Sequence, residues 1–197
     1  MKKKTYFAAI DLETGGLNDA MHEDDVLIPK GSIGSLHYAI LEFALIIYDN
    51  SFNQVGEPIS FIVNHSKDDL QLKVGEWSKN QFKDTLMKDC LLADKTLSTI
   101  EDLAINHLEK NGVTENDEVY LLGNSIRLDM AFISAQMRNL KKRLHYRMLD
   151  VSTLKLLFNE IHGRDKANFD KKSKHEALGD IKESVDELKF YIDNFII

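Results

Sequence analysis

An apolar run brings two acids up to a pair of glycines at Ala8-Ala9-Ile10-Asp11-Leu12-Glu13-Thr14-Gly15-Gly16-Leu17. Side chains alternate between the two faces of a β-strand, so the carboxylates of Asp11 and Glu13 are expected on one face and the leucine between them on the other. The glycines would let the chain turn where the strand ends. Two adjacent carboxylates repel each other, and a divalent cation that prefers oxygen ligands relieves this repulsion. The pattern therefore predicts a metal site, although an isolated pair of acids also suits a solvated strand end.

Length and composition favour one compact domain covering residues 1–197. The chain has 197 residues, is 43% hydrophobic and contains two prolines, which suits a single sizeable core. Its one cysteine, Cys90, rules out an internal disulfide, is expected in the core and favours a reducing compartment. The apolar run behind the basic start is interrupted at Asp11, too early for a signal peptide or a membrane span. We expect a cytoplasmic protein that does not enter a membrane.

The charge is unevenly distributed along the chain. The net charge is −7, yet residues 138–174 hold eleven Lys and Arg against four Asp and Glu, a local balance of +7 that leaves −14 elsewhere. The overall sign argues against a generic nucleic-acid coat protein, whereas a basic flank beside acidic clusters suits an anionic substrate brought to a metal. Solvated surface lysines are the alternative explanation.

The periodicity of apolar residues predicts an α/β domain with a mixed five-stranded sheet flanked by helices. Residues 18–37 lack a period and are expected to form a long loop or lid, a loop insertion beside the site. Beyond the first strand, the pattern predicts strands at 39–48, 60–63, 119–122 and 146–151, and helices at 97–108, 126–140, 152–161 and 177–192. Asn124 or Ser125 is expected to cap the second of these helices.

Two further acids and a histidine join the first pair. Asp129 falls within the apolar stripe of its helix, and an unpaired carboxylate buried there would cost several kcal/mol. Asp180 borders the apolar stripe of the last helix, and His175 stands at its start. Carboxylates converging from separate elements, with open positions for water and phosphate oxygens, are what two Mg²⁺ ions need.

Three motifs in order resemble those of the DEDD superfamily of 3′-5′ exonucleases, in the DnaQ-like subclass with a catalytic histidine (DEDDh). They are Asp11-Leu12-Glu13-Thr14, then Asn124-Ser125-Ile126 with Asp129 and Phe132, then His175-Glu176-Ala177 with Asp180. Within this superfamily the chain is most similar to the oligoribonuclease family, through residues 145–147, 149–155, 180–184 and 187–188.

The resemblance implies a ribonuclease-H-like fold, a homodimer and cleavage of very short single-stranded RNA from its 3′ end with two Mg²⁺ or Mn²⁺ ions. Asp11 would contact both ions, Glu13 and Asp180 would complete one, and Asp129 would hold the other. His175 would act as the general base.

The resemblance also suggests residues that bind substrate. Leu17 and Trp77 would pack against bases, although Trp77 also suits a core or an interface. Arg147 could instead support the dimer or the fold, and Asp150 is expected to be structural. The positions carried over for the rest of the substrate, including its far phosphate, are Asn124, Ser125, Arg147, Ser152, Thr153 and Lys155.

Some positions depart from the family pattern. Phe82 stands where the family carries a histidine, and the segment after Glu13 differs as well. We therefore expect a preference for two to about five nucleotides, with weaker discrimination than a strict dinucleotide hydrolase.

Two alternatives share these motifs: a DnaQ-like DNA exonuclease for proofreading or trimming, and an inactive nucleic-acid-binding module on the same fold. The five filled catalytic positions disfavour the inactive module, and residues 150–155 favour oligoribonuclease over a DNA exonuclease.

Overall fold

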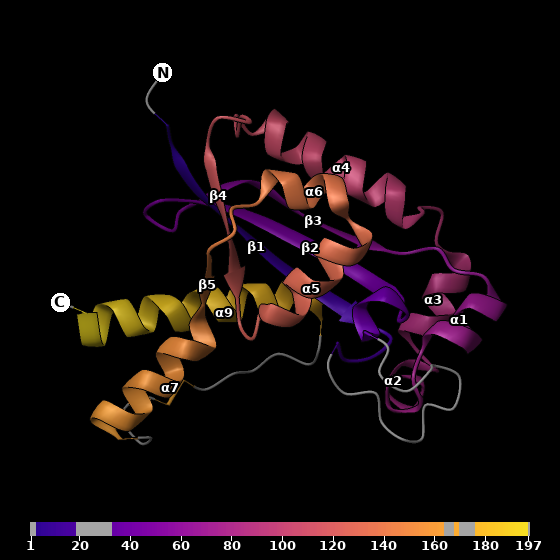
Figure 1. Cartoon of the computed structure of the whole chain (residues 1–197). Helices are drawn as coiled ribbons and strands as arrows, with labels where there is room; N and C mark the ends of the chain where they lie inside the picture. The colour runs from indigo at the N-terminus through magenta and orange to yellow at the C-terminus, as the bar shows by residue number, and fades with distance from the viewer. Residues whose placement is uncertain (1–2, 19–32, 164–167, 170–175, 197) are drawn as a thin grey trace.

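The computed structural model describes residues 3–18, 33–163, 168–169 and 176–196, with the side chain of residue 196 left out. Its centre is a mixed sheet of five strands in the order β3-β2-β1-β4-β5 (Figure 1). β1 pairs antiparallel with β2 and parallel with β4, while β3 and β5 form the two edges. The strands are β1 (Thr5–Thr14), β2 (Ile40–Asp49), β3 (Gln54–Ile62), β4 (Glu118–Gly123) and β5 (Met148–Asp150). The expected α/β mixed sheet is confirmed.

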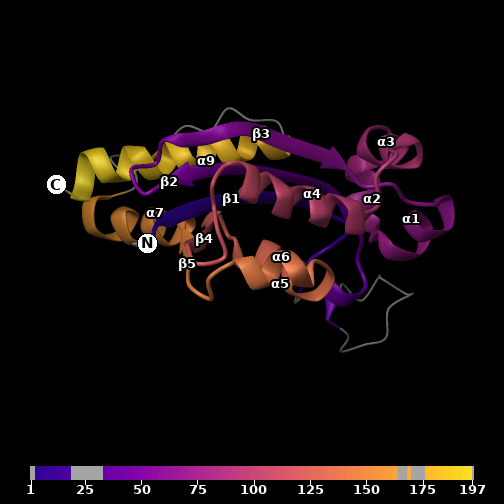
Figure 2. The ribbon, with the colours of Figure 1, turned by 90° about the horizontal axis from the view of Figure 1, so that it is seen from above.

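Two helical layers cover the sheet. One face packs against α4 (Leu97–Lys110), α5 (Arg127–Gln136) and α6 (Arg138–Arg143). The other packs against α7 (Val151–His162) and α9 (Ala177–Tyr191), which runs on into a π-helical turn at Ile192–Ile196. Figure 2 shows the sheet between these layers.

The side chains of β1 alternate between the two faces of the sheet, and this alternation places both acids of the strand on the face covered by one helical layer. Ala8, Ile10 and Leu12 are buried on the face covered by α4 and α5. Ala9 is buried on the opposite face, against α7 and α9, and Asp11 and Glu13 follow it there by the two-residue period. The two carboxylates therefore lie under α9.

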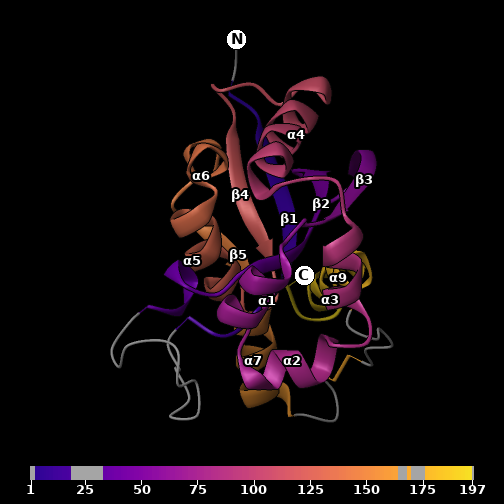
Figure 3. The same cartoon turned by 90° about the vertical axis from the view of Figure 1, so that its right-hand side faces the viewer.

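A group of short helices stands beyond the carboxyl end of β1 (Figure 3). It comprises α1 (Lys67–Lys73), α2 (Glu76–Phe82) and α3 (Leu86–Leu92), and a short 3-10 turn at Gly34–Leu36 precedes β2. These helices share a small core with the start of β2, in which Cys90 is fully buried as expected.

Several predicted boundaries are wrong. β3 begins well before residue 60, and β5 spans fewer residues than 146–151. The N-cap of α5 is Ile126, without a side-chain cap; the Asn124 amide is bound to α9, and the Ser125 backbone is left-handed. The N-cap of α7 is Asp150, whose side chain accepts from the backbone N–H of Ser152.

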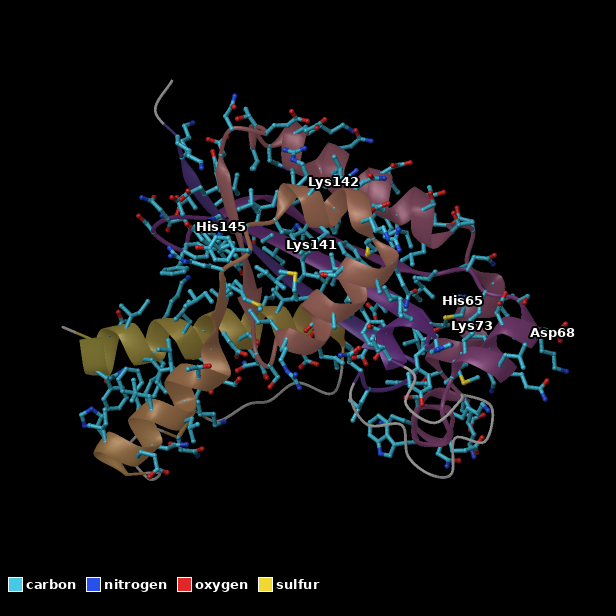
Figure 4. All side chains as sticks on the ribbon, viewed as in Figure 1. His65, Asp68, Lys73, Lys141, Lys142 and His145 are labelled. Atoms are coloured by element: carbon cyan, nitrogen blue, oxygen red, sulfur yellow. The ribbon has the colours of Figure 1, made fainter. Side chains whose placement is uncertain are left out.

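The basic run is divided between elements. Lys141 and Lys142 lie on α6, on the sheet face opposite α9 (Figure 4). Arg143 is held to α4, because its Nη1 lies 2.8 Å from Oε1 of Glu109. This part of the run does not flank the acids of β1, so the expected basic flank is wrong for α6.

Most of the predicted insertion at 18–37, namely residues 19–32, lies outside the described residues. Within the described part of the chain, no helix is long and apolar enough to cross a membrane.

Candidate active site

Three acids meet where β1 passes under the start of α9. Asp11 and Glu13 come from β1, and Asp180 comes from the first turn of α9. One carboxylate oxygen from each lies within 4.8 Å of the other two. α9 is held over the strand by Ala177, Ile181 and its other buried apolar residues, so burial of this stripe also delivers Asp180 to the strand.

The fourth predicted acid joins them from the opposite side of the sheet. Asp129 lies in the first turn of α5 and is only 7% exposed. Its Oδ1 accepts a 3.0 Å hydrogen bond from the backbone N–H of Leu12, the residue between the two acids of β1. Burial raises the pKa of the Asp129 carboxyl to about 8, and the negative charge of Asp11 adds to the shift. The structure thus places Asp129 against β1 between the two acids of that strand, while the three carboxylates whose oxygens lie within 4.8 Å of one another are those of Asp11, Glu13 and Asp180.

Glu42 is an acid near this group that the motifs did not identify. It lies on β2 directly opposite Glu13, and its Oε1 accepts a 2.8 Å hydrogen bond from Oγ of Ser60. Burial raises the pKa of Glu13 to about 7, with Glu42 the next cause and Asp180 after it. Burial also raises the pKa of Glu42. Its position inside the apolar run of β2 was a signal that sequence reasoning could have used, since an acid in a buried strand needs a reason.

The donor set suits a hard divalent cation. Asp11, Glu13 and Asp180 offer carboxylate oxygens from partly buried side chains, and among the residues that the structure describes neither sulfur nor imidazole joins the ligand atoms of this group. Oxygen-only sites of this kind select Mg²⁺ or Mn²⁺ over softer metals. The raised pKa values of Glu13 and Asp129 show that their negative charges are poorly compensated by the protein alone.

These pKa values predict how the metal-free protein responds to pH. Glu13 and Asp129 have ordinary values of 4.5 and 3.8, raised to about 7 and about 8 in the folded chain. The folded state then holds their protons more tightly than the unfolded chain, so stability present at acid pH is lost as the pH rises through the folded values. We expect the thermal midpoint in EDTA to fall between pH 5 and pH 8.5.

Adding Mg²⁺ or Mn²⁺ should raise the midpoint more at pH 8.5 than at pH 5, because the cation binds the ionised carboxylates. Asp129→Asn, which cannot ionise, is the control and should flatten the fall in EDTA. A wild-type midpoint in EDTA that does not change over this pH range would contradict the expectation.

A pocket of about 540 Å³ opens beside Glu13, toward α2. Leu17 and Trp77 line it and are exposed, Trp77 to 70%, whereas Phe82 lines it from a largely buried position. Gly15 and Gly16 line this pocket at positions where neighbouring groups approach the backbone closely. A Cβ at Gly15 would collide with the carbonyl oxygen of Lys73, and a Cβ at Gly16 would collide with the ring of Tyr38. These glycines are therefore needed for close packing, and not for the turning freedom that the sequence suggested.

A second pocket, of about 550 Å³, adjoins the first, since Leu17 and Leu128 line both. Ser125 and Ser152 line the second pocket. Ser125 has a φ of 54°, a left-handed conformation unusual for a residue with a side chain. Its N–H donates to Oδ1 of Asp150 at 3.0 Å and to Oγ of Ser152 at 3.2 Å, which holds the strained turn in place.

Other predicted substrate residues line neither of these two pockets. Asn124 donates to side chains of α9, and Lys155 lies 3.5 Å from Oε1 of Glu187. Arg147 is exposed and its guanidinium stands 5.2 Å from the ring centre of Tyr146, while Thr153 is exposed on α7. His175 lies outside the described residues.

A family model described as Exonuclease matches residues 8–188, which contain all of these acids. The chain belongs to the exonuclease family. The prediction of this family and of its enzyme class, a hydrolase, is thereby confirmed.

Curated relatives include an oligoribonuclease of Bordetella pertussis, 35% identical over 160 residues that cover 80% of this chain and 86% of the relative. An oligoribonuclease of Francisella tularensis subsp. tularensis is 36% identical over 152 residues, covering 77% of this chain and 83% of the relative. Among solved structures, the nuclease domain of 3′hExo, a DEDDh family member, aligns with a TM-score of 0.57 at 13% identity, covering 98% of this chain and 94% of that domain. The likeness confirms the predicted ribonuclease-H-like exonuclease fold.

Proposed function

We propose that this exonuclease removes nucleotides from the 3′ end of short RNAs by hydrolysis that depends on two Mg²⁺ or Mn²⁺ ions. The observation that carries the proposal is the meeting of Asp11, Glu13 and Asp180 within 4.8 Å of one another, beside two adjoining pockets. The oligoribonuclease relatives support the choice of RNA as substrate.

The four acids would hold the ions, with Asp11 shared, Glu13 and Asp180 on one ion and Asp129 on the other. When bound, the ions polarise the scissile phosphate and stabilise the charge on the leaving oxygen. His175 takes the proton of the attacking water as general base. The hydrogen bond from Leu12 N–H orients Asp129 before any ligand arrives, so this carboxylate need not reorganise.

The two pockets would hold the substrate on either side of Leu17. Exposed Trp77 and Leu17 offer apolar faces on which any base can pack. Ser125 and Ser152 line the second pocket, where a phosphate would lie, and the Ser152 hydroxyl, which donates to Oδ1 of Asp150, would have to turn to donate to it. Arg147 and Thr153 stay proposed ligands of the far phosphate. Each pocket lies within the ~300–1,000 Å³ typical of small-ligand sites, which suits one or two nucleotides and not a duplex.

The test is hydrolysis of end-labelled RNAs and DNAs of two to twenty nucleotides, with Mg²⁺ or Mn²⁺ and with EDTA as the blank. We expect mononucleotides released from the 3′ end of short RNAs only when metal is present. Faster hydrolysis of DNA at every length would identify a DNA exonuclease, and binding without hydrolysis would identify an inactive module.

We also propose that the chain acts as a single-domain homodimer, as the oligoribonuclease resemblance implies. Sedimentation at micromolar concentration tests this: a mass of one chain, 22.6 kDa, would contradict it.

Substrate length is where Phe82 is expected to matter. The Phe82 ring lines the first pocket, beside Leu17 and Trp77, and the residue is 8% exposed. It therefore offers an apolar surface but no hydrogen-bond donor for a terminal phosphate. We expect kcat/KM for 5′-phosphorylated RNA to be highest at two to about five nucleotides and lower at ten. Phe82→His should raise the ratio of kcat/KM between two and five nucleotides, because the imidazole supplies the missing donor.

Phe82→Leu is the matched control, since it removes the ring without adding a donor. Both substitutions disturb the small core around Cys90 and should lower stability, but a ratio measured on one sample does not depend on the fraction that is folded. If the wild type already prefers the dinucleotide by a hundredfold and Phe82→His leaves this preference unchanged, Phe82 does not determine substrate length.

A further inference from the structure

A buried polar cluster lies on α9 behind the candidate metal site. Its centre is Glu187, which is fully buried although it is an acid. Oε1 of Glu187 accepts from the hydroxyl of Tyr191 at 2.9 Å and lies 3.5 Å from Nζ of Lys155, on α7. Oε2 accepts from Nδ2 of Asn124 at 3.0 Å. Burying a charged carboxylate costs free energy unless its hydrogen-bond and ion-pair partners are well placed. These contacts therefore specify one arrangement of α7, α9 and the loop after β4.

Asn124 connects this cluster to the turn that leads into α5. The same Nδ2 donates to Oγ of Ser184 at 2.8 Å, and Oγ of Ser184 in turn donates to the backbone carbonyl of Asp180 at 2.8 Å. One amide therefore joins the loop after β4 to the turn of α9 that carries a candidate metal ligand. The loop itself continues into the helix that carries Asp129.

The other side of the same turn is fixed as well. Ser125 follows Asn124 in a left-handed conformation, and its N–H is bound by Asp150 and Ser152 at the start of α7. The turn is thus held between α7 and α9 and has little freedom to move without breaking hydrogen bonds to one of them. A shift of α9 would change the separation of Asp180 from the acids of β1.

We propose that Asn124, Ser184 and Glu187, with Lys155 as the counter-charge of Glu187, form a clasp that positions Asp180 for metal binding. Asn124 and Lys155 then serve the site through α9 and do not contact substrate, unlike the role that their motifs suggest. The clasp residues are positioning residues, and the inference rests on the metal-dependent function proposed above. Partners that orient metal ligands typically change metal affinity or activity by ~10–100-fold when they are removed.

The experiment compares Asn124→Ala and Ser184→Ala with Tyr191→Phe. The first two cut the connection between the loop and Asp180, whereas Tyr191→Phe removes a hydrogen bond to the same buried carboxylate from within α9. The readouts are Mn²⁺ affinity by titration calorimetry without RNA, kcat and KM for a short RNA, and the thermal midpoint in EDTA.

We expect Asn124→Ala and Ser184→Ala each to weaken Mn²⁺ binding by ~10-fold and to lower kcat with little change in KM. Tyr191→Phe should lower the thermal midpoint and leave Mn²⁺ affinity and kcat near the wild-type values. In the double variant the two effects on Mn²⁺ affinity should be less than additive, because both substitutions break one connection. Glu187→Gln keeps an acceptor oxygen and should retain more Mn²⁺ affinity than Glu187→Ala.

Two outcomes would overturn the proposal. If Asn124→Ala raises KM while Mn²⁺ affinity is unchanged, Asn124 contacts substrate. If Asn124→Ala and Ser184→Ala change only the thermal midpoint, as the control does, the cluster merely stabilises the fold. Because Mn²⁺ affinity is measured without RNA, a wild type that binds Mn²⁺ but hydrolyses no RNA would refute the proposed function and leave this test intact.

Discussion

Asp11→Asn is expected to lower the rate of RNA hydrolysis by at least ~10²–10³-fold while the fold stays intact. Asp11 is one of three acids whose oxygens lie within 4.8 Å, and its charge also acts on the buried carboxyl of Asp129. The amide has the same shape as the carboxylate but carries no charge, so it cannot serve as the ligand that the proposed function shares between two ions. The measurement is kcat for a 5′-phosphorylated dinucleotide in saturating Mg²⁺.

The same substitution should leave the thermal midpoint in EDTA equal to that of the wild type, or raise it, because it removes a source of like-charge repulsion from the site. A suitable control is Asp186→Asn, which removes a charge from an exposed position on the same helix that carries Asp180. We expect Asp186→Asn to keep wild-type activity. More than a few per cent of residual activity in Asp11→Asn would show that the assignment of a shared ligand is wrong.

The sequence was most informative where a pattern repeats along one element. The apolar alternation of β1 and the stripe of α9 specify which face each presents, and these two facts together bring Asp180 over Asp11 and Glu13. Asp129 could be recognised because an acid inside an apolar stripe must have a partner. In the structure this partner is the backbone N–H of Leu12.

The sequence was less informative where a residue's environment depends on elements far apart in the chain. Glu187 is buried on α9 where α7 supplies Lys155 and the loop after β4 supplies Asn124 as partners. Glu42 is likewise a neighbour of the site only through the register of β2 on β1. Strand register and helix packing are tertiary properties, so no local pattern reports them.

The predicted caps of α5 are wrong for a related reason. Asn124 and Ser125 have the chemistry of helix caps, and so the pattern favoured them at the start of α5. In the fold, the Asn124 side chain is bound to α9, the Ser125 backbone is left-handed with its N–H bound to Asp150, and the N-cap is Ile126. A local preference gave way to tertiary hydrogen bonds beside the candidate site, where such exceptions are expected.

His175→Ala is expected to lower kcat by ~10²–10⁴-fold, which corresponds to about 3 to 5 kcal/mol of activation free energy. The expectation comes from the position of His175 in the third motif, five residues before Asp180. A general base acts on the attacking water and not on the bound substrate, so the affinity for short RNA measured in Ca²⁺ should hardly change. A large loss of affinity in His175→Ala would instead assign this histidine to substrate binding.

The pH dependence of the rate separates a base from a structural histidine. If neutral imidazole accepts the proton, kcat of the wild type rises with pH through the titration of His175 and then levels off, and His175→Ala lacks this rising limb. The matched control is His107→Gln, because His107 lies on α4 across the sheet from α9, and burial lowers the pKa of its imidazole. His107→Gln should keep both the rate and the rising limb. A rising limb that persists in His175→Ala would transfer the role of base to another group, and Glu13, whose pKa is raised to about 7 by burial and by Glu42, would be the first to test.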